Sequence, residues 1–364
     1  MDRFFDLVTE PARAAGPQTK STPEQSSSSL IKLNANESVY GPSPKALAAM
    51  RSAMERSHFY PDNDAIDLRR KLAQLHGISA DQVLISNGTT ALLGVIARTL
   101  LGPGLNAVTS TCSFISYPDV TQAAGAKLIE VPALHNGFDL DAILRAIDAN
   151  TRVVFIANPN NPTGTLADAA AVDQFLSSVP AHVVVVLDEA YSDYAQFFAA
   201  RRGIDYSHSL DHVRADRNVL VLRTFSKVHG LAGVRVGYAL GPAALVGYVA
   251  RMQDLFDVSV LAQAAAIAAL DDQGHTQQAL EKNAEQAAWM ENELTRLGYA
   301  VTPTWTNFIA LDVRQDAREF ARNLRRKGVL VRPLAAWGAP TSIRVTLGLP
   351  EQNEFFVRAL TAEK

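Results

Sequence analysis

Cysteine is almost absent from this 364-residue sequence. Cys112 is the single example, so no disulfide can form within the chain, and no group of cysteines and histidines has the spacing of a zinc site. Chains without disulfides are typical of reducing compartments. We therefore expect a cytoplasmic protein without a bound metal.

An excess of either charge is also missing. Lys and Arg number 34 against 37 Asp and Glu, which gives a net charge of -3 and a pI near 6.3. Nucleic acids and anionic membranes select proteins with a basic surface, so neither is an expected partner. Long hydrophobic runs are lacking as well. No stretch reaches membrane-spanning length, and the N-terminal sequence has no apolar core of an export signal.

Apolar residues themselves are plentiful at 48% of the sequence, and the length suggests two domains. Between Asp81 and Leu240, short apolar runs alternate with helical patterns, which predicts βα units and a mostly parallel sheet. We expect an α/β fold whose large domain, residues 57–272, contains a seven-stranded sheet covered by helices. Residues 31–56 and 273–364 are expected to form a smaller α+β domain, and residues 1–30 an N-terminal arm rich in polar residues.

One apolar run ends in two carboxylates. The sequence "HVVVVL" is followed by "DEAYSDY" at residues 188–194, and the run lacks alternation, as expected of a strand covered on both faces. Ligands of open α/β sheets bind outside the carboxyl ends of the strands. Asp188 and Tyr191 are therefore expected at a position where they could bind a cofactor. The same stretch would also suit an acidic turn that caps the following helix.

The next strand end carries a lysine in "TFSKVHGLAGVRVGY", residues 224–238. A lysine removed from water loses affinity for its proton and can attack a carbonyl group to form a Schiff base. Lys227 is the candidate. Thr224, Ser226 and Arg235 add two hydroxyls and a guanidinium, which are suitable donors for a phosphate. Taken alone, the Ser-Lys pair would also fit a surface turn.

Two further stretches follow strand patterns. In "VLISNGTTALLGVI" the backbone N–H groups of a helix start, with the hydroxyls of Thr89 and Thr90, would form an anion site. In "ANPNNPTG" the prolines would fix Asn161 so that its amide donates to a phenolate-type oxygen. A common helix cap and a plain Asn-Pro turn are the alternatives.

Together these stretches supply the parts of a pyridoxal phosphate site. Such a site requires a lysine for the aldehyde, an acid beside the pyridine nitrogen, donors for the ring oxygen and a phosphate cradle. From Leu33 onward the chain resembles the fold-type I pyridoxal phosphate aminotransferases of the aspartate aminotransferase superfamily. The resemblance implies pyridoxal 5'-phosphate as the cofactor and amino-group transfer as the reaction.

The resemblance also implies individual roles. Asp188 matches the aspartate that keeps the pyridine nitrogen protonated, and Tyr191 and Asn161 match the residues that hydrogen-bond the ring oxygen. Lys227 matches the Schiff-base lysine, which also moves the proton between substrate and cofactor. Tyr117, in "SFISYPDV", falls where an aromatic ring stacks on the pyridine face. The phosphate positions of the superfamily match Gly88, Thr89, Thr224, Ser226 and Arg235.

Other residues match the positions that bind the substrate in this superfamily. Arg344, in "SIRVTLG", falls on the arginine that binds the substrate carboxylate, although a structural salt bridge is an alternative. The runs "LNANES", "YGPSP", "FYPDNDAIDLRRKLA", "GVLVRPL" and "RVTLGLPEQNEFFVRAL" resemble the histidinol-phosphate aminotransferase group. That likeness implies that Arg332 binds the substrate phosphate. It also implies that Tyr60 reaches the cofactor phosphate across a homodimer interface. Tyr40 and Asn161 are further expected on the substrate side.

Some positions depart from that group. Thr90 stands where an acidic residue is usual, and His229 stands two residues after the lysine where an aromatic ring is common. The favoured hypothesis is an aminotransferase that uses glutamate as donor and converts imidazole-acetol phosphate to histidinol phosphate. An aromatic amino acid aminotransferase, a specialised biosynthetic aminotransferase or a decarboxylase on the same scaffold is the alternative. A non-catalytic binding module is a more distant one.

Overall fold

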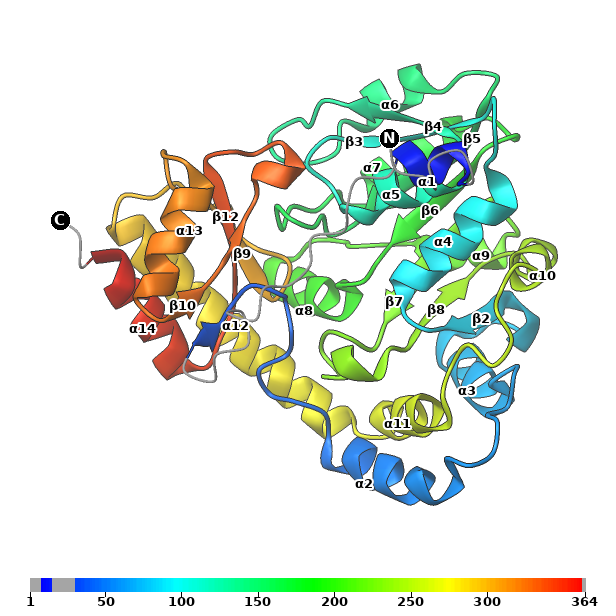
Figure 1. Cartoon of the computed structure of the whole chain (residues 1–364), viewed down its shortest axis with the longest axis horizontal. Coiled ribbons are helices and arrows are strands. Elements are labelled where there is room, and N and C mark those ends of the chain that lie inside the picture. Colours follow the sequence, from blue (N-terminus) through cyan, green and yellow to red (C-terminus); the bar gives the residue numbers. More distant parts are fainter. Residues whose placement is uncertain (1–7, 15–29, 362–364) are drawn as a thin grey trace.

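The computed structural model describes residues 8–14 and 30–361, arranged around one large sheet and two smaller ones (Figure 1). The large sheet has seven strands in the order β2-β8-β7-β6-β5-β3-β4. β8 is antiparallel to both of its neighbours, and the other pairs are parallel. The predicted α/β fold with a mostly parallel seven-stranded sheet is therefore confirmed. The strands are β2 (Val83–Ser86), β3 (Asn106–Ser110), β4 (Lys127–Val131), β5 (Thr151–Ala157), β6 (Val184–Asp188), β7 (Val219–Thr224) and β8 (Gly237–Leu240).

The central strand β6 shows why its sequence does not alternate. Val185 and Leu187 belong to one hydrophobic cluster, while Val186 belongs to the cluster on the opposite face of the sheet. Because successive side chains of a strand point to opposite faces, a strand buried on both sides needs apolar residues at every position. One face is covered by α4 (Thr89–Leu100), α5 (Ser116–Ala123) and α10 (Ala243–Ala250), and the other by α3 (Ile66–His76), α7 (Ala169–Ser178) and α11 (Val260–Leu270).

The C-terminal part forms a separate core. β9 (Phe308–Asp312), β12 (Ser342–Thr346) and β11 (Arg332–Pro333) form an antiparallel sheet in the order β11-β12-β9. β1 (Ile31–Lys32) pairs in parallel with β10 (Val329–Leu330). The long helix α12 (Gln273–Arg296) runs alongside (Figure 1), with α13 (Ala317–Arg326) and α14 (Pro350–Thr361) around the same core. This arrangement corresponds to the expected smaller α+β unit.

The segment 31–56 contacts both parts of the molecule. β1 joins the smaller core, whereas α2 (Pro44–Ala53) packs on α11, and Ala46 lies in the core of the large sheet. Residues 251–259 separate α10 from α11. The remaining elements are α1 (Glu10–Ala14), α6 (Leu140–Ala146), α8 (Ser192–Arg202), α9 (Ser209–Arg214) and the 3-10 turns η3 (Met54–Arg56), η4 (Ala80–Gln82), η5 (Ala232–Val234) and η6 (Ala335–Trp337). Most of the predicted N-terminal arm lies outside the described residues.

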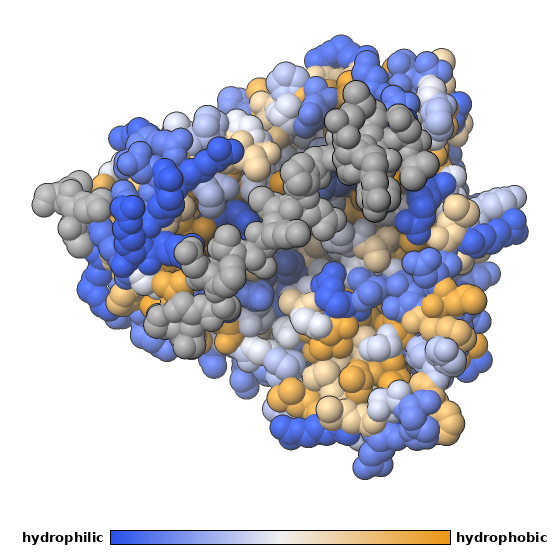
Figure 2. Space-filling view, in the orientation of Figure 1, coloured by the Kyte–Doolittle hydropathy of each residue, from blue (hydrophilic) through white to orange (hydrophobic). Residues whose placement is uncertain are grey.

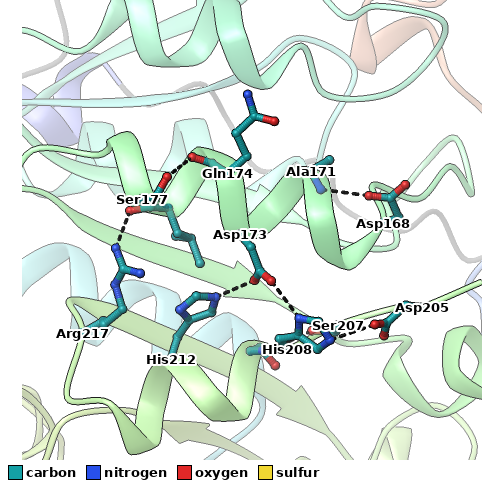
Figure 3. A network of polar contacts seen from close by, with 12 residues as sticks. Asp168, Ala171, Asp173, Gln174, Ser177, Asp205, Ser207, His208, His212 and Arg217 are labelled. Carbon is teal, nitrogen blue, oxygen red and sulfur yellow. Dashed lines mark hydrogen bonds and ion pairs between the residues drawn. The ribbon is translucent and has the colours of Figure 1, made fainter.

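A polar network fastens α9 to α7 on one face of the sheet (Figure 3). The two carboxylate oxygens of Asp173 hydrogen-bond His208 Nδ1 and His212 Nε2, each at 2.7 Å. The other ring nitrogen of His208 contacts Asp205 at 2.8 Å. The hydrogen bond to Asp173 is the main reason why the pKa of His208 is raised. None of these side chains lines the cavity described below, so we assign the network a structural role.

Within residues 8–14 and 30–361, no helix combines the length and the hydrophobicity that a membrane crossing requires.

Candidate active site

The carboxyl ends of β5, β6 and β7 border a cavity of about 230 Å³. These strands are neighbours in the sheet, so the polar residues that follow them in the sequence meet at one edge. The predicted site residues that line this cavity are Thr89, Thr90, Asn161, Asp188, Tyr191, Thr224, Ser226, Lys227 and Arg235. In the sequence these residues extend from Thr89 to Arg235, and the fold brings them into one cavity.

Asp188 ends β6 and is 5% exposed. The hydroxyl of Tyr117 donates to its Oδ2 at 3.2 Å, and the backbone N–H of Ala190 donates to its Oδ1 at 3.3 Å. Burial raises the pKa of the Asp188 carboxyl to about 6, although the Tyr117 hydrogen bond, the Ala190 N–H and the charge of Lys227 oppose this effect. A carboxylate held in such a site favours a positively charged partner, which would stabilise its ionised form.

Lys227 lies in the turn after β7 and is half-buried. Its Nζ donates to the backbone carbonyl of Asn36 at 3.4 Å and lies 5.3 Å from the centroid of the Tyr191 ring. It has no salt bridge to a carboxylate among the described residues. The amine is thus held at the cavity wall by a long hydrogen bond to a neutral acceptor. Because no carboxylate among these residues stabilises its charged form by an ion pair, this arrangement suits a nucleophile.

An anion cradle forms where β2 passes into α4. Gly88 has φ +88°, and a Cβ at this position would come within 2.5 Å of Arg235 Nη2. At Gly237 a Cβ would lie 2.9 Å from the backbone nitrogen of Thr89. Arg235 is exposed, and its Nη1 lies 3.5 Å from Ser226 Oγ. These glycines allow a guanidinium, a helix start and several hydroxyls to approach one another, which is an arrangement that suits a phosphate.

Arg344 and Arg332 come from the small sheet and do not line this cavity, although Arg344 contacts Asn161, which does. They are register partners on the antiparallel strands β12 and β11. Arg344 Nη2 and Arg332 Nε both donate to the carbonyl of Asn34, at 3.1 and 3.3 Å, and Arg344 Nη1 donates to Asn161 Oδ1. Burial lowers the pKa of Arg344 to about 10, with a further decrease from the charge of Arg332 and an opposing effect of Tyr191. The Nε of Arg344 is buried without a hydrogen-bond partner.

The predicted aromatic residues are placed differently from one another. Tyr117 is fully buried, stacks on Phe155 at 4.8 Å between centroids, and does not line the cavity. Besides Tyr191, the aromatic side chain on the cavity wall is that of Phe114, so the expected stacking position of Tyr117 is not supported by its placement. Tyr40 is half-buried outside the cavity wall, where burial raises its pKa to about 12. Tyr60 is 81% exposed and stacks on Phe256 at 4.4 Å.

Three features were missed in the sequence. Phe114 precedes Tyr117 by three residues, so both were reasonable candidates in one motif. Glu189, the second carboxylate of "DEAY", is 1% exposed and forms a two-point ion pair with Arg223, at 3.0 and 2.7 Å. This pair ties the ends of β6 and β7. The third is Asn36, in "LNANES", which contacts both Tyr191 and Lys227.

Comparisons with known proteins agree with this geometry. A family model described as "Aminotransferase class I and II" matches residues 28–360. A protein named histidinol-phosphate aminotransferase 2, from Pseudomonas aeruginosa, is 46% identical over 91% of this chain and 88% of its own. The histidinol-phosphate aminotransferase of Moorella thermoacetica is 43% identical over 91% of this chain and 84% of its own. The crystal structure of the Sinorhizobium meliloti histidinol-phosphate aminotransferase in complex with pyridoxal-5'-phosphate superposes with a TM-score of 0.87. It has 29% identity and covers 97% of this chain and 96% of that one.

The chain therefore belongs to the class I and II aminotransferase family, and the predicted resemblance is confirmed. The fold and the relatives define it as an enzyme that transfers amino groups. The cavity also fits the cofactor named in the Sinorhizobium structure. Its wall contains a lysine, a buried carboxylate and hydroxyl donors, and it lies beside the glycine-lined cradle. The buried Nε of Arg344 has no hydrogen-bond acceptor in the described part of the protein.

Proposed function

We propose that this aminotransferase uses pyridoxal 5'-phosphate to exchange an amino group between glutamate and the pair histidinol phosphate and imidazole-acetol phosphate. The names of its relatives support the substrate assignment, and the cavity supports the cofactor. When bound, the cofactor supplies an electron sink for the bond that breaks at the substrate carbon. Lys227 binds the aldehyde and then carries the proton at that carbon. Asp188 holds the ring nitrogen in its protonated form.

The observation that carries the substrate proposal is the Arg332–Arg344 pair. Two guanidinium groups lie on adjacent strands, and among the described residues they donate to the Asn34 carbonyl and the Asn161 amide rather than to a carboxylate. Burial lowers the pKa of both. Two desolvated cations side by side disfavour each other, and a dianionic group would relieve this repulsion. Histidinol phosphate carries such a group, whereas phenylalanine and tyrosine carry only a carboxylate.

The substrate class can be tested by single-turnover reactions of the cofactor-loaded enzyme. The visible absorption of the cofactor is followed after addition of glutamate, histidinol phosphate, phenylalanine or tyrosine. We expect a fast response to glutamate and histidinol phosphate and a slow one to the aromatic amino acids. A response to phenylalanine or tyrosine equal to that with histidinol phosphate would contradict the assignment.

The Arg332→Gln variant should lose reactivity mainly toward histidinol phosphate. A charge-assisted hydrogen bond to a dianion contributes enough for a decrease in kcat/KM of about 10- to 100-fold. The reaction with phenylalanine should change much less, because that substrate has no phosphate. The ratio of the two kcat/KM values measures the effect and cancels any general loss of active enzyme. An equal decrease for both substrates would show that Arg332 has only a structural role.

We further propose a cytoplasmic homodimer. Exposed apolar side chains are grouped in and around the segments 54–66 and 252–256, where Phe59 is 63%, Tyr60 is 81% and Leu255 is 75% exposed. Figure 2 shows hydrophobic residues gathered near α2 and α11 on the same side of the molecule. Exposed patches of this kind are typical of protein–protein interfaces. The single cysteine agrees with a reducing compartment.

The Leu255→Asp variant is expected to shift the enzyme from dimer to monomer. A charge placed in an apolar interface core would remain buried without a partner, which strongly disfavours association. Analytical ultracentrifugation at micromolar concentration would measure this shift. Because Tyr60 is proposed to reach the cofactor phosphate bound by the partner subunit, the monomeric variant should also bind the cofactor more weakly. A wild-type protein that sediments as a monomer would contradict the proposal.

A further inference from the structure

Asn36 is a buried asparagine at the centre of the contacts between the small sheet and the cavity. It is 1% exposed and has φ 56°, a left-handed backbone conformation that asparagine tolerates better than most residues. Its side-chain Nδ2 donates to the hydroxyl oxygen of Tyr191 at 2.8 Å. Its backbone carbonyl accepts from Lys227 Nζ at 3.4 Å and from Asn307 Nδ2 at 3.1 Å. One residue thus touches both Tyr191, which is expected at the cofactor ring oxygen, and Lys227.

The orientation of the Asn36 amide is set by Thr346 on β12. Thr346 Oγ1 accepts the backbone N–H of Asn36 at 2.9 Å and donates its own proton to Asn36 Oδ1 at 3.3 Å. With Oδ1 occupied as an acceptor, the amide presents Nδ2 to Tyr191. The reversed amide would leave the Thr346 proton without an acceptor in a buried site, which is unfavourable.

The direction of the Tyr191 hydroxyl proton follows from this contact. A phenolic hydroxyl has one proton, and an amide NH₂ group can donate to it but cannot accept from it. The proton of Tyr191 therefore cannot point toward Asn36. Tyr191 lines the cavity, so its proton remains available to an acceptor there.

We propose that Asn36 is a positioning residue that directs the hydroxyl proton of Tyr191 into the cavity, toward the ring oxygen of the bound cofactor. The proposal rests on the proposed function and on the contact with the cofactor ring oxygen that the family resemblance implies for Tyr191. The proposal also connects Tyr191 to the residues expected to bind the substrate. Thr346 and Arg344 lie two residues apart on β12, so they share one face of the strand. The strand that presents the anion-binding arginine also fixes the donor to the cofactor.

The test uses two substitutions that keep the left-handed backbone. Asn36→Gly removes only the side chain, because glycine adopts positive φ freely and keeps the carbonyl that Lys227 and Asn307 contact. Asn36→Asp keeps the shape but replaces the donor by an acceptor, which would draw the Tyr191 proton away from the cavity. Asn136→Gly is the matched control, since Asn136 also has positive φ (63°) but is exposed and far along the chain from these contacts.

The measurement is the pH at which the visible absorption of the cofactor-loaded enzyme changes. A hydroxyl that donates to the anionic ring oxygen stabilises the basic form, so its loss should move this pH upward. We expect an increase of about 0.5 to 1 unit for Asn36→Gly, the size of one hydrogen bond. Asn36→Asp should give a larger increase, and Asn136→Gly none. Thr346→Val, which removes the group that orients the amide, should give an increase smaller than that of Asn36→Gly.

The outcomes separate this inference from the proposed function. If the wild-type enzyme has no pH-dependent visible band, the proposed cofactor chemistry itself is wrong. If the wild-type band is present and the transitions of Asn36→Gly and Asn36→Asp coincide with it, the positioning role is overturned. A loss of thermal stability without a change in the transition pH would leave Asn36 as a structural residue only. Thr346→Val provides the answer should the Asn36→Asp variant fail to retain the cofactor.

Discussion

Replacing Lys227 with alanine is expected to abolish both the covalent attachment of the cofactor to the enzyme and its turnover. The amine binds the aldehyde and carries the proton of the reacting carbon, and no other lysine lines the cavity. Removing a general acid–base group alone lowers rates by about 10² to 10⁴-fold. The loss of the covalent anchor adds to this effect. Stopped-flow absorbance with glutamate would measure the rate of amino transfer in both proteins.

Lys227→Arg is the informative companion to the alanine variant. It retains the positive charge near the Tyr191 ring and Asp188, but a guanidinium cannot form the covalent bond and does not lose its proton near neutral pH. We expect it to fold and to bind the cofactor without covalent attachment, so borohydride should not fix the cofactor to it. Turnover by Lys227→Arg close to that of the wild type would refute the role of Lys227.

The main parts of the site could be predicted because they follow apolar runs in the sequence. Asn161, Asp188 and Lys227 each come shortly after one of three apolar runs, β5 to β7, and parallel strands place their carboxyl ends at a common edge. The order of the strands in the sheet was not needed for this inference. The phosphate cradle was predictable for a similar reason, since a glycine turn before a helix start presents free N–H groups.

Other features depend on register and packing, which the local sequence does not encode. Arg332 and Arg344 meet only because β11 and β12 pair in one particular register. The apolar face of α2 gives no indication of its partner, and the structure packs it on α11 rather than on the small core. Phe114 and Tyr117 are three residues apart in the sequence and contact each other edge to face, with centroids 5.7 Å apart. Only the tertiary structure shows which of them reaches the cavity.

Asp188 should limit the stability of the cofactor-free protein, and Asp188→Asn should relieve this limit. Burial raises the pKa of the carboxyl from 3.8 to about 6. In the unfolded chain the group ionises near its ordinary pKa, so above that pH the folded state is penalised for holding a buried charge. The penalty begins near pH 4, increases up to the folded-state pKa and is complete above it. At neutral pH the shift corresponds to about 3 kcal/mol.

The expected result is a variant that is more stable without cofactor and nearly inactive with it. Asparagine keeps the shape: its Oδ1 can still accept from the Ala190 N–H, and its Nδ2 can donate to the Tyr117 hydroxyl oxygen. It carries no charge, however, to hold the ring nitrogen protonated. Urea unfolding of the cofactor-free proteins should show a gain for Asp188→Asn that roughly doubles between pH 5 and pH 8. Turnover with glutamate should fall by about 10² to 10³-fold or more, as when a preorganised electrostatic partner is removed. The exposed Asp119→Asn serves as the control and should change neither quantity.

A gain in stability combined with a loss of activity would identify Asp188 as a residue kept for chemistry at the expense of folding. The pH dependence makes the interpretation specific. A gain that is the same at pH 5 and pH 8 would reflect packing rather than charge. A variant less stable than the wild type at pH 8 would mean that the ionised carboxylate is stabilised in the folded protein even before the cofactor binds. In that case the nearby Lys227 would be its partner, and Lys227→Ala should then destabilise the cofactor-free protein at the same pH.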